Sequence, residues 1–302
     1  MSASVNDHEN PFGSRLLRCK ALVAEAAQGL RDPLGRELAG QVQWWPLDGL
    51  AGEWPVAVVG EGPPVLLLHG FDSSFLEFRR LAPLLAGHYQ LFIPDLFGFG
   101  FCPRPEGGRN NPQVVLEHLE RVLDAVLEHS GAAQVGVIGA SMGGAVAMEL
   151  ARRRPQQVER LLLLAPAGLS GQPMPVPPLL DQLGARFLGL PAIRRGLCRT
   201  AFAQPDRDVG PAELEIASLH LRCPNWAGAL ASFARSGGFA GSGSPLPPQP
   251  IQVIWGRDDR ILSRPQKQDV QSLLGERITE LDGCGHLPHI DQPATVARLW
   301  HD

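Results

Sequence analysis

Residues 135–150, VGVIGASMGGAVAMEL, place one serine between two glycines where the pattern of secondary structure changes. The first half is a continuous apolar run typical of a buried strand, and the second half has the apolar spacing of a helix. The serine stands in the pattern G-x-S-x-G, formed by Gly139, Ser141 and Gly143. A turn of this kind strains the serine and exposes its hydroxyl, while the glycines allow neighbouring backbone to approach closely. We therefore interpret Ser141 as a nucleophile.

A serine hydroxyl is a weak nucleophile unless a base takes its proton and an acid orients that base. On a strand–turn–helix of this type the partners follow later in the chain, acid first and histidine second. Asp258 and Asp259 follow an apolar run at 251–256, and His286 follows another at 277–283. Because the loops after parallel strands meet at one edge of a sheet, these residues can reach Ser141. The order predicts a Ser–His–Asp triad in which either Asp258 or Asp259 is the acid.

The elements that must position these residues alternate from residue 65 onward. Apolar runs typical of strands covered on both faces lie at 65–70, 89–95, 134–139, 158–166, 251–256 and 277–283. Helical patterns separate them, most clearly at 112–129, where Asn111 can cap the helix and Pro112 suits its first turn. Two antiparallel strands are expected earlier, at 41–47 and 54–59. The sequence predicts an α/β fold with a mostly parallel, eight-stranded sheet flanked by helices.

The alternation stops over residues 167–249, which are bracketed by Pro- and Gly-rich segments. Connections this long are uncommon unless they have a function, so we predict a helical lid inserted into the sheet domain. The core then comprises residues 41–166 and 250–302. Residues 1–40 are predicted to form an amphipathic helical extension. Packing of this extension on the core is favoured, and peripheral contact with a membrane through the extension or the lid is the alternative.

Composition and charge narrow the class of protein. The 302 residues are 44% hydrophobic, which is enough for a substantial core, and a net charge of -4 without charged blocks argues against nucleic acid as a partner. The five cysteines form no C-x-x-C pair, which favours a reduced, cytoplasmic setting. There is no secretory-signal pattern, and no apolar run approaches the ~20 residues that cross a bilayer. No cluster has zinc-site spacing, and the predicted chemistry needs no metal or cofactor.

Five segments, in order, resemble the landmarks of the α/β-hydrolase superfamily: HGFDSS, DLFGFG, GASMGG, WGRDDRI and GCGHLPHIDQP. The resemblance implies the α/β-hydrolase fold, with Ser141 as nucleophile, His286 as base and Asp259 as the orienting acid. It also implies an oxyanion hole formed by the backbone N–H groups of Phe71 and Met142. The resemblance covers the chain from about residue 56 to its last residue.

The same resemblance reduces the number of candidate reactions. Epoxide hydrolases and haloalkane dehalogenases of this fold carry an aspartate in place of Ser141. The meta-cleavage C–C hydrolases usually carry tryptophan where this chain has Leu287. These departures favour hydrolysis of a carboxylic ester through an acyl-enzyme. A C–C bond hydrolase and a slow-turnover signalling receptor of the same fold are the alternatives.

The expected substrate is a small apolar ester, because the predicted lid is rich in Leu, Pro, Ala and Phe. Its predicted contacts are Phe71, Trp226, Phe233 and Leu287. HGFDSSFLEFR and CGHLPHIDQP are also similar to segments of plant and cyanobacterial hydrolases of the chlorophyll dephytylase and pheophytinase kind. That similarity adds a phytyl-type ester to the expected substrates.

Overall fold

An eight-stranded sheet forms the centre of the computed structural model, which describes residues 11–105 and 107–301. The strands are β1 (Val42–Pro46), β2 (Glu53–Val59), β3 (Pro64–Leu68), β4 (Gln90–Pro94), β5 (Val135–Ala140), β6 (Val158–Leu164), β7 (Ile251–Gly256) and β8 (Ile278–Leu281). Their spatial order is β1-β2-β4-β3-β5-β6-β7-β8. The pairs β1–β2 and β2–β4 are antiparallel, and the pairings from β4 to β8 are parallel. The predicted mostly parallel, eight-stranded sheet is confirmed.

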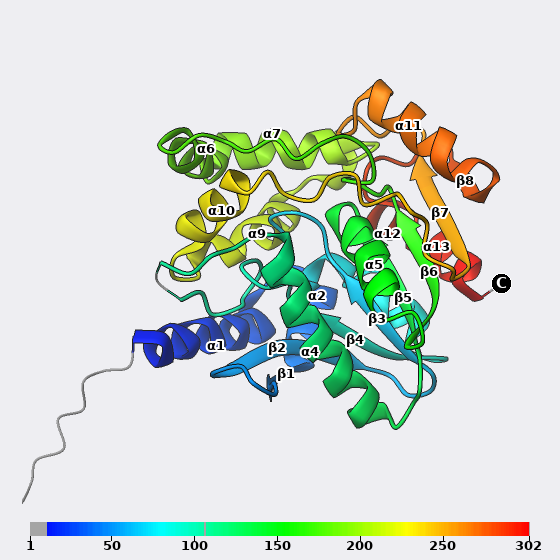
Figure 1. Ribbon diagram of the computed structural model, residues 1–302. Helices are drawn as coiled ribbons and strands as arrows, with labels where there is room; N and C mark the ends of the chain where they lie inside the picture. The colour runs from blue at the N-terminus through cyan, green and yellow to red at the C-terminus, as the bar shows by residue number, and fades with distance from the viewer. Residues whose placement is uncertain (1–10, 106, 302) are drawn as a thin grey trace, which may run out of the picture.

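Helices cover both faces of this sheet (Figure 1). On one face, α4 (Pro112–Ser130), α5 (Met142–Arg153) and α11 (Arg264–Leu274) bury their apolar residues in one cluster. On the other, α1 (Pro11–Gly29), α2 (Pro33–Gly40), α3 (Ala82–Leu85) and α13 (Pro293–His301) do so in a second cluster. The short elements are η1 (Phe75–Phe78), η3 (Gly275–Arg277) and α12 (Pro288–Asp291). The sheet is therefore buried on both faces, as its continuous apolar runs predict.

The residues at the two ends of α4 determine where this helix begins and ends. The side chain of Asn111 accepts a hydrogen bond from the N–H of Val114 at 3.0 Å, and Pro112 occupies the first helical position. The helix ends at Gly131, whose φ of 66° is left-handed. These are the cap and the first-turn proline that the sequence predicts.

The inner face of α1 packs against the sheet domain. Cys19, Leu22, Val23 and Ala26 are buried in the same apolar cluster as residues of β3. This is the packing that the sequence favours for the N-terminal extension, whose residues 1–10 lie outside the described residues. Among residues 11–105 and 107–301, we find no helix with the length and apolar character needed to cross a membrane.

Between β6 and β7 lies a layer of helices above the carboxyl ends of the strands (Figure 1). It contains α6 (Leu180–Leu188), α7 (Pro191–Ala201), α8 (Pro205–Asp208), α9 (Pro211–Leu219), η2 (His220–Arg222) and α10 (Trp226–Arg235). We call residues 165–250 the insertion. It occupies the place that the sequence assigns to a lid, above the sheet edge where Ser141 follows β5.

Candidate active site

The backbone of Ser141 is strained at the junction of β5 and α5. Its φ of 51° and ψ of −119° lie in a region that residues other than glycine rarely adopt. Three backbone hydrogen bonds hold this conformation. The N–H of Ser141 donates to Leu164 O at 2.8 Å, and its carbonyl accepts from Gly144 at 2.9 Å and Ala167 at 3.0 Å. Because β6 and the start of the insertion supply two of these partners, the sheet edge itself fixes the serine.

The glycines on either side of Ser141 are required by close packing. A Cβ atom at Gly139 would lie 2.3 Å from the carbonyl oxygen of Gly143, and one at Gly143 would lie 2.1 Å from that of Leu68. Both distances are far below van der Waals contact, and the obstructing atoms are backbone. The G-x-S-x-G pattern thus lets β5, α5 and β3 approach one another around the serine.

Ser141, His286 and Asp259 form a continuous hydrogen-bonded chain. His286 Nε2 lies 2.9 Å from Ser141 Oγ, and His286 Nδ1 lies 3.0 Å from Asp259 Oδ2. The histidine is 5% exposed, and its backbone N–H donates to Ala201 O at 2.7 Å. This geometry allows the imidazole to take the hydroxyl proton while the carboxylate holds the required tautomer.

The carboxylate of Asp259 is anchored independently of His286. Its Oδ1 accepts from the backbone N–H groups of Ile261 at 2.8 Å and Leu262 at 3.2 Å, and its Oδ2 accepts from Trp255 Nε1 at 3.0 Å. Burial opposes ionisation, but the hydrogen bond and charge of His286, with the two backbone donors, lower the pKa of Asp259 below its ordinary value. Asp258 is exposed. The structure therefore places Asp259, and not Asp258, against the histidine.

The two residues predicted to form the oxyanion hole lie next to Ser141. Met142 is the first residue of α5, so its N–H has no partner within the helix and lies at the positive end of the helix dipole. Phe71 follows Gly70 in the loop after β3, and a Cβ atom at Gly70 would lie 3.3 Å from Ser141 Cβ. The loop that carries the Phe71 N–H is therefore in contact with the serine, as an oxyanion hole requires.

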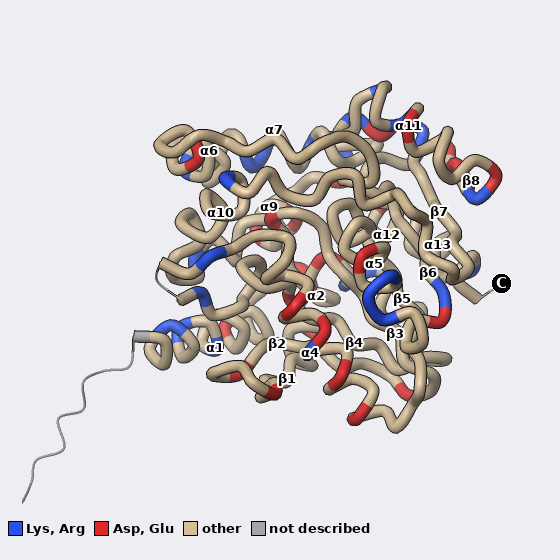
Figure 2. Tube along the Cα trace, in the orientation of Figure 1, with Lys and Arg blue, Asp and Glu red and all other residues tan. Residues whose placement is uncertain are grey.

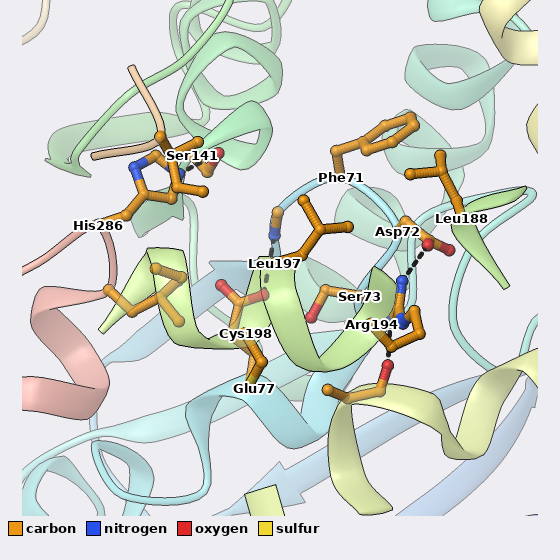
Figure 3. Close-up of a pocket in the computed structure, with 15 residues that line it drawn as sticks. Phe71, Asp72, Ser73, Glu77, Ser141, Leu188, Arg194, Leu197, Cys198 and His286 are labelled. Carbon is orange, nitrogen blue, oxygen red and sulfur yellow. Dashed lines mark hydrogen bonds and ion pairs between the residues drawn. The ribbon is translucent and has the colours of Figure 1, made fainter. Parts of the chain in front are cut away.

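Two cavities meet at Phe71, which lines both of them. The first, of about 270 Å³, contains Ser141 and His286 and is roofed by residues of the insertion, among them Leu188. Figure 3 shows Ser141 and His286 together on one side of this cavity. The second, of about 490 Å³, is bounded by Met142 and by both ends of the insertion. Phe71 and Met142, the two residues predicted to form the oxyanion hole, thus both border the second cavity.

This fold and site can be compared with known proteins. A family model described as the alpha/beta hydrolase family matches residues 65–299. The chain belongs to the alpha/beta hydrolase family. The α/β-hydrolase resemblance stated from the sequence is confirmed, and the coarse activity that the family indicates is hydrolysis.

Relatives of this alpha/beta hydrolase match most of its length. It is 30% identical over 258 residues to a 2-hydroxymuconate semialdehyde hydrolase of Pseudomonas sp. (strain CF600), covering 80% of this chain and 87% of the relative. It is 25% identical over 291 residues to the alpha/beta hydrolase domain-containing protein VTE7 of Arabidopsis thaliana, covering 91% of this chain and 87% of that relative. Among solved structures, 2-hydroxy-6-oxo-6-phenylhexa-2,4-dienoate hydrolase (BphD) from Rhodococcus sp. strain RHA1 has a TM-score of 0.70 at 22% identity, covering 86% of this chain and 97% of that one.

The residues predicted to contact substrate in this alpha/beta hydrolase are not all at the cavities. Leu287 lines the first cavity and Phe233 the second, where the Phe233 ring lies 5.9 Å from that of Phe71. Trp226 lines neither of these two cavities. Its indole N–H instead donates to Asp72 Oδ1 at 2.8 Å, because a buried tryptophan nitrogen needs an acceptor. Trp226 therefore supports the insertion from within, and its contact with substrate stays a prediction.

The sequence reasoning missed the role of Asp72, a buried carboxylate beside Phe71. Asp72 Oδ2 accepts from Arg194 Nη1 at 2.5 Å, and Asp72 Oδ1 lies 3.1 Å from His220 Nε2 and accepts from Trp226. Figure 3 shows the Asp72–Arg194 pair at the first cavity. Burial opposes ionisation, but His220 and Arg194 lower the pKa of Asp72. Three elements of the insertion, α7, η2 and α10, are thus tied to the loop that carries Phe71.

Glu77 is a second buried carboxylate that the sequence reasoning missed. Asp72 and Glu77 both lie in the segment HGFDSSFLEFR. Glu77 lines the first cavity from η1. Its Oε2 accepts from the N–H of Gly70 at 3.3 Å, and its Oε1 lies 3.0 Å from Nε2 of the buried His289. Burial opposes ionisation, but His289 and His69 lower the pKa of Glu77 to about 2. The carboxylate therefore holds Gly70, one residue before the Phe71 N–H.

Other titratable groups near Ser141 are poorly suited to start the reaction. Burial raises the pKa of Cys198 to about 11, so its thiol stays protonated at neutral pH. Burial lowers the pKa of His69 to about 4. The His69 ring hydrogen-bonds Gly70 O at 2.8 Å and accepts from Leu96 N at 3.0 Å, so it holds the loop after β3. Within the described part of the chain, no group of three or more His, Cys, Asp or Glu side chains is arranged to hold a metal ion.

We expect Glu77→Gln to remove one part of the acid sensitivity of the fold. The folded-state pKa lies below the ordinary value of 4.5, so the ionised carboxylate stabilises the fold above that pH and this stabilisation is lost as the pH falls toward about 2. Between about pH 6 and about pH 3, the wild type should lose on the order of 2 kcal/mol more unfolding free energy than the variant. Urea unfolding at both pH values measures this difference. Equal losses would show that Glu77 has the same pKa in both states.

Proposed function

We propose that this alpha/beta hydrolase cleaves a carboxylic ester of an apolar substrate through an acyl-enzyme. The observation that carries the proposal is the Ser141–His286–Asp259 chain at the first cavity. Ser141 Oγ attacks the ester carbonyl carbon while His286 Nε2 takes the hydroxyl proton, and the N–H groups of Phe71 and Met142 stabilise the oxyanion. His286 then protonates the leaving alcohol oxygen. It next deprotonates a water molecule, which attacks the acyl carbon and releases the acid.

The charges of the first cavity favour a neutral substrate. Arg194 lines this cavity, but it is already paired with Asp72 and is not free to bind a substrate carboxylate. Glu77 adds a second carboxylate to the same wall. An anionic substrate would therefore lose its hydration without gaining a free cationic partner. The second cavity adds apolar contacts, since Met174, Val176, Phe233 and Phe239 line it.

Hydrolysis of a C–C bond is the second candidate. It is supported by the relative named 2-hydroxymuconate semialdehyde hydrolase, because the molecule in that name contains no ester. The same name denotes a carboxylate, which the paired Arg194 is poorly placed to bind. Leu287, where the C–C hydrolases usually carry tryptophan, points in the same direction. We therefore rank ester hydrolysis first.

Steady-state rates with a substrate panel test this ranking. The panel contains p-nitrophenyl esters of increasing acyl length, a phytyl ester and 2-hydroxymuconate semialdehyde. We expect turnover of neutral esters, with kcat/KM rising from acetate to medium-chain acyl groups. Turnover of the semialdehyde alone would favour the C–C candidate. A single slow turnover with every substrate would favour the signalling receptor, whose triad has the same appearance.

Phe233→Leu is expected to change the chain-length preference more than the chemistry. Phe233 is 3% exposed, lines the second cavity, and packs against the rings of Phe71 and Phe99 at 5.9 and 5.1 Å. A smaller side chain removes apolar contact with a long acyl or alcohol group, so kcat/KM for a long ester should fall by about tenfold. The acylation rate with p-nitrophenyl acetate should change less than about threefold.

The matched control for this substitution is Phe101→Leu. Phe101 is also buried, but it lines neither cavity, so its replacement should alter stability without altering the chain-length preference. If Phe233→Leu lowered the rates with long and short esters equally, Phe233 would only support the fold. The proposal that the second cavity binds substrate would then fail.

A further inference from the structure

The outer side of the insertion is apolar where a surface helix is ordinarily polar. Seven large apolar side chains of the described residues are at least half exposed, and six of them lie between residues 174 and 190. These six are Met174, Leu179, Leu180, Leu183, Phe187 and Leu190, with exposed fractions from 50% to 81%. We call them the outer patch. Exposed apolar side chains gathered in this way mark an interaction surface.

The helix α6 presents two opposite sides with different partners. Leu180, Leu183 and Phe187 are spaced by three and four residues and therefore lie on one side of the helix. The opposite side is buried against α10, where Asp181 accepts from Arg235 at 2.6 Å and Ala185 is covered. In Figure 1, α6 and α7 lie along the top of the helical layer, with α10 below α6. The outward side of α6 is therefore largely uncovered by the described residues, since Leu180, Leu183 and Phe187 are 53% to 60% exposed.

The charge around the outer patch is positive, although the chain as a whole carries -4. Arg186 and Arg195 are exposed on α6 and α7, and neither guanidinium group has a hydrogen-bond or ion-pair partner within residues 11–105 and 107–301. The acid of this segment, Asp181, is buried and paired with Arg235. Figure 2 shows lysine and arginine positions along these two helices. The patch therefore combines apolar side chains with unpaired cations.

We propose that the outer patch binds the surface of a lipid bilayer that contains anionic headgroups. The leucines and Phe187 enter the boundary between headgroups and acyl chains, while Arg186 and Arg195 meet lipid phosphates. A second copy of this chain fits the patch less well. A twofold contact between two such patches brings the arginines of each copy close to those of the other.

The patch is also continuous with the substrate cavity. Met174, one residue of the outer patch, is 81% exposed, and it also lines the second cavity together with Met142 and Phe71. Under this proposal, an apolar substrate enters the second cavity from the bilayer beside Met174. Membrane binding goes beyond the proposed hydrolysis and needs no chemistry from Ser141. Ser141→Ala should accordingly bind vesicles as the wild type does, which separates the two proposals.

Flotation of the full chain with vesicles tests the proposal. We expect binding to phosphatidylcholine vesicles that contain phosphatidylglycerol, and weaker binding to phosphatidylcholine alone. The double variant Leu183→Ser/Phe187→Ser should lower the partition coefficient at least about tenfold. Arg186→Glu should lower it about fivefold or more, and added salt should reduce this difference. Neither variant alters a residue that lines the two cavities, so labelling of Ser141 by a fluorophosphonate should be unchanged in both.

The matched control is Leu17→Ser on α1, where Leu17 is the remaining half-exposed apolar side chain, at 68%. This variant should bind vesicles as the wild type does. Loss of binding in Leu17→Ser alone would place the membrane contact on the N-terminal extension and overturn the proposal. So would absence of wild-type binding, or equal binding by the double variant. The patch would instead be assigned to a second copy if the wild type did not bind vesicles and sedimentation velocity showed a wild-type dimer that the double variant does not form.

Discussion

Ser141→Ala should abolish covalent labelling by a fluorophosphonate and lower kcat/KM for esters by on the order of a millionfold. The nucleophile is lost, whereas the oxyanion donors and the cavities remain. The variant therefore keeps only the stabilisation of the transition state that those groups provide. Alanine also has a Cβ atom, and the strained backbone at this position is therefore unchanged. Mass spectrometry of the labelled peptide and steady-state rates measure the two effects.

Ser73→Ala is the matched control for this substitution. Ser73 lines the same cavity as Ser141, but it has no histidine within hydrogen-bonding distance among the described residues. Labelling should persist at Ser141 in this variant. Labelling of the Ser141→Ala protein at another residue, with turnover retained, would refute the acyl-enzyme mechanism.

Asp259→Asn should lower kcat by on the order of ten-thousandfold. The asparagine NH₂ group would donate to His286 Nδ1 and so place the ring proton on Nε2, which faces Ser141 Oγ. The histidine could then no longer accept the hydroxyl proton. Steady-state kinetics with a neutral ester measures the loss.

The fold should survive this substitution, because an asparagine Oδ1 can still accept from the N–H groups of Ile261 and Leu262. Thermal unfolding monitored by circular dichroism checks this point. Asp258→Asn is the matched control and should change kcat less than about threefold, since Asp258 is exposed. The opposite ranking of the two variants would reassign the acid.

The sheet and the residues around Ser141 could be predicted from sequence because their determinants are local. The strand, turn and helix around Ser141 lie within 19 consecutive residues, 135–153. The predicted strand boundaries lie within two residues of those observed, for example 251–256 for β7 (Ile251–Gly256). Strands buried on both faces have continuous apolar runs that end at polar or glycine residues, and these ends are visible in the chain itself.

The contacts of the insertion could not be predicted in the same way. Trp226 meets Asp72 across 154 positions of the chain, and no local pattern indicates which acceptor a buried indole finds. The residues of α6 posed a related problem, because apolar side chains lie on both of its sides. Spacing identifies such sides, but only the packing of α10 shows which of them is covered.

The positive φ of Ser141 means that the residue needed for turnover lowers the stability of the fold at this position. Glycine adopts this conformation almost freely, whereas any other residue there costs on the order of 1–3 kcal/mol. A library of variants that is screened for heat resistance alone should therefore accumulate glycine at residue 141. Serine would persist only in populations that are also selected for product formation. The frequency of serine at this position after such a screen is thus a direct record of which property was under selection.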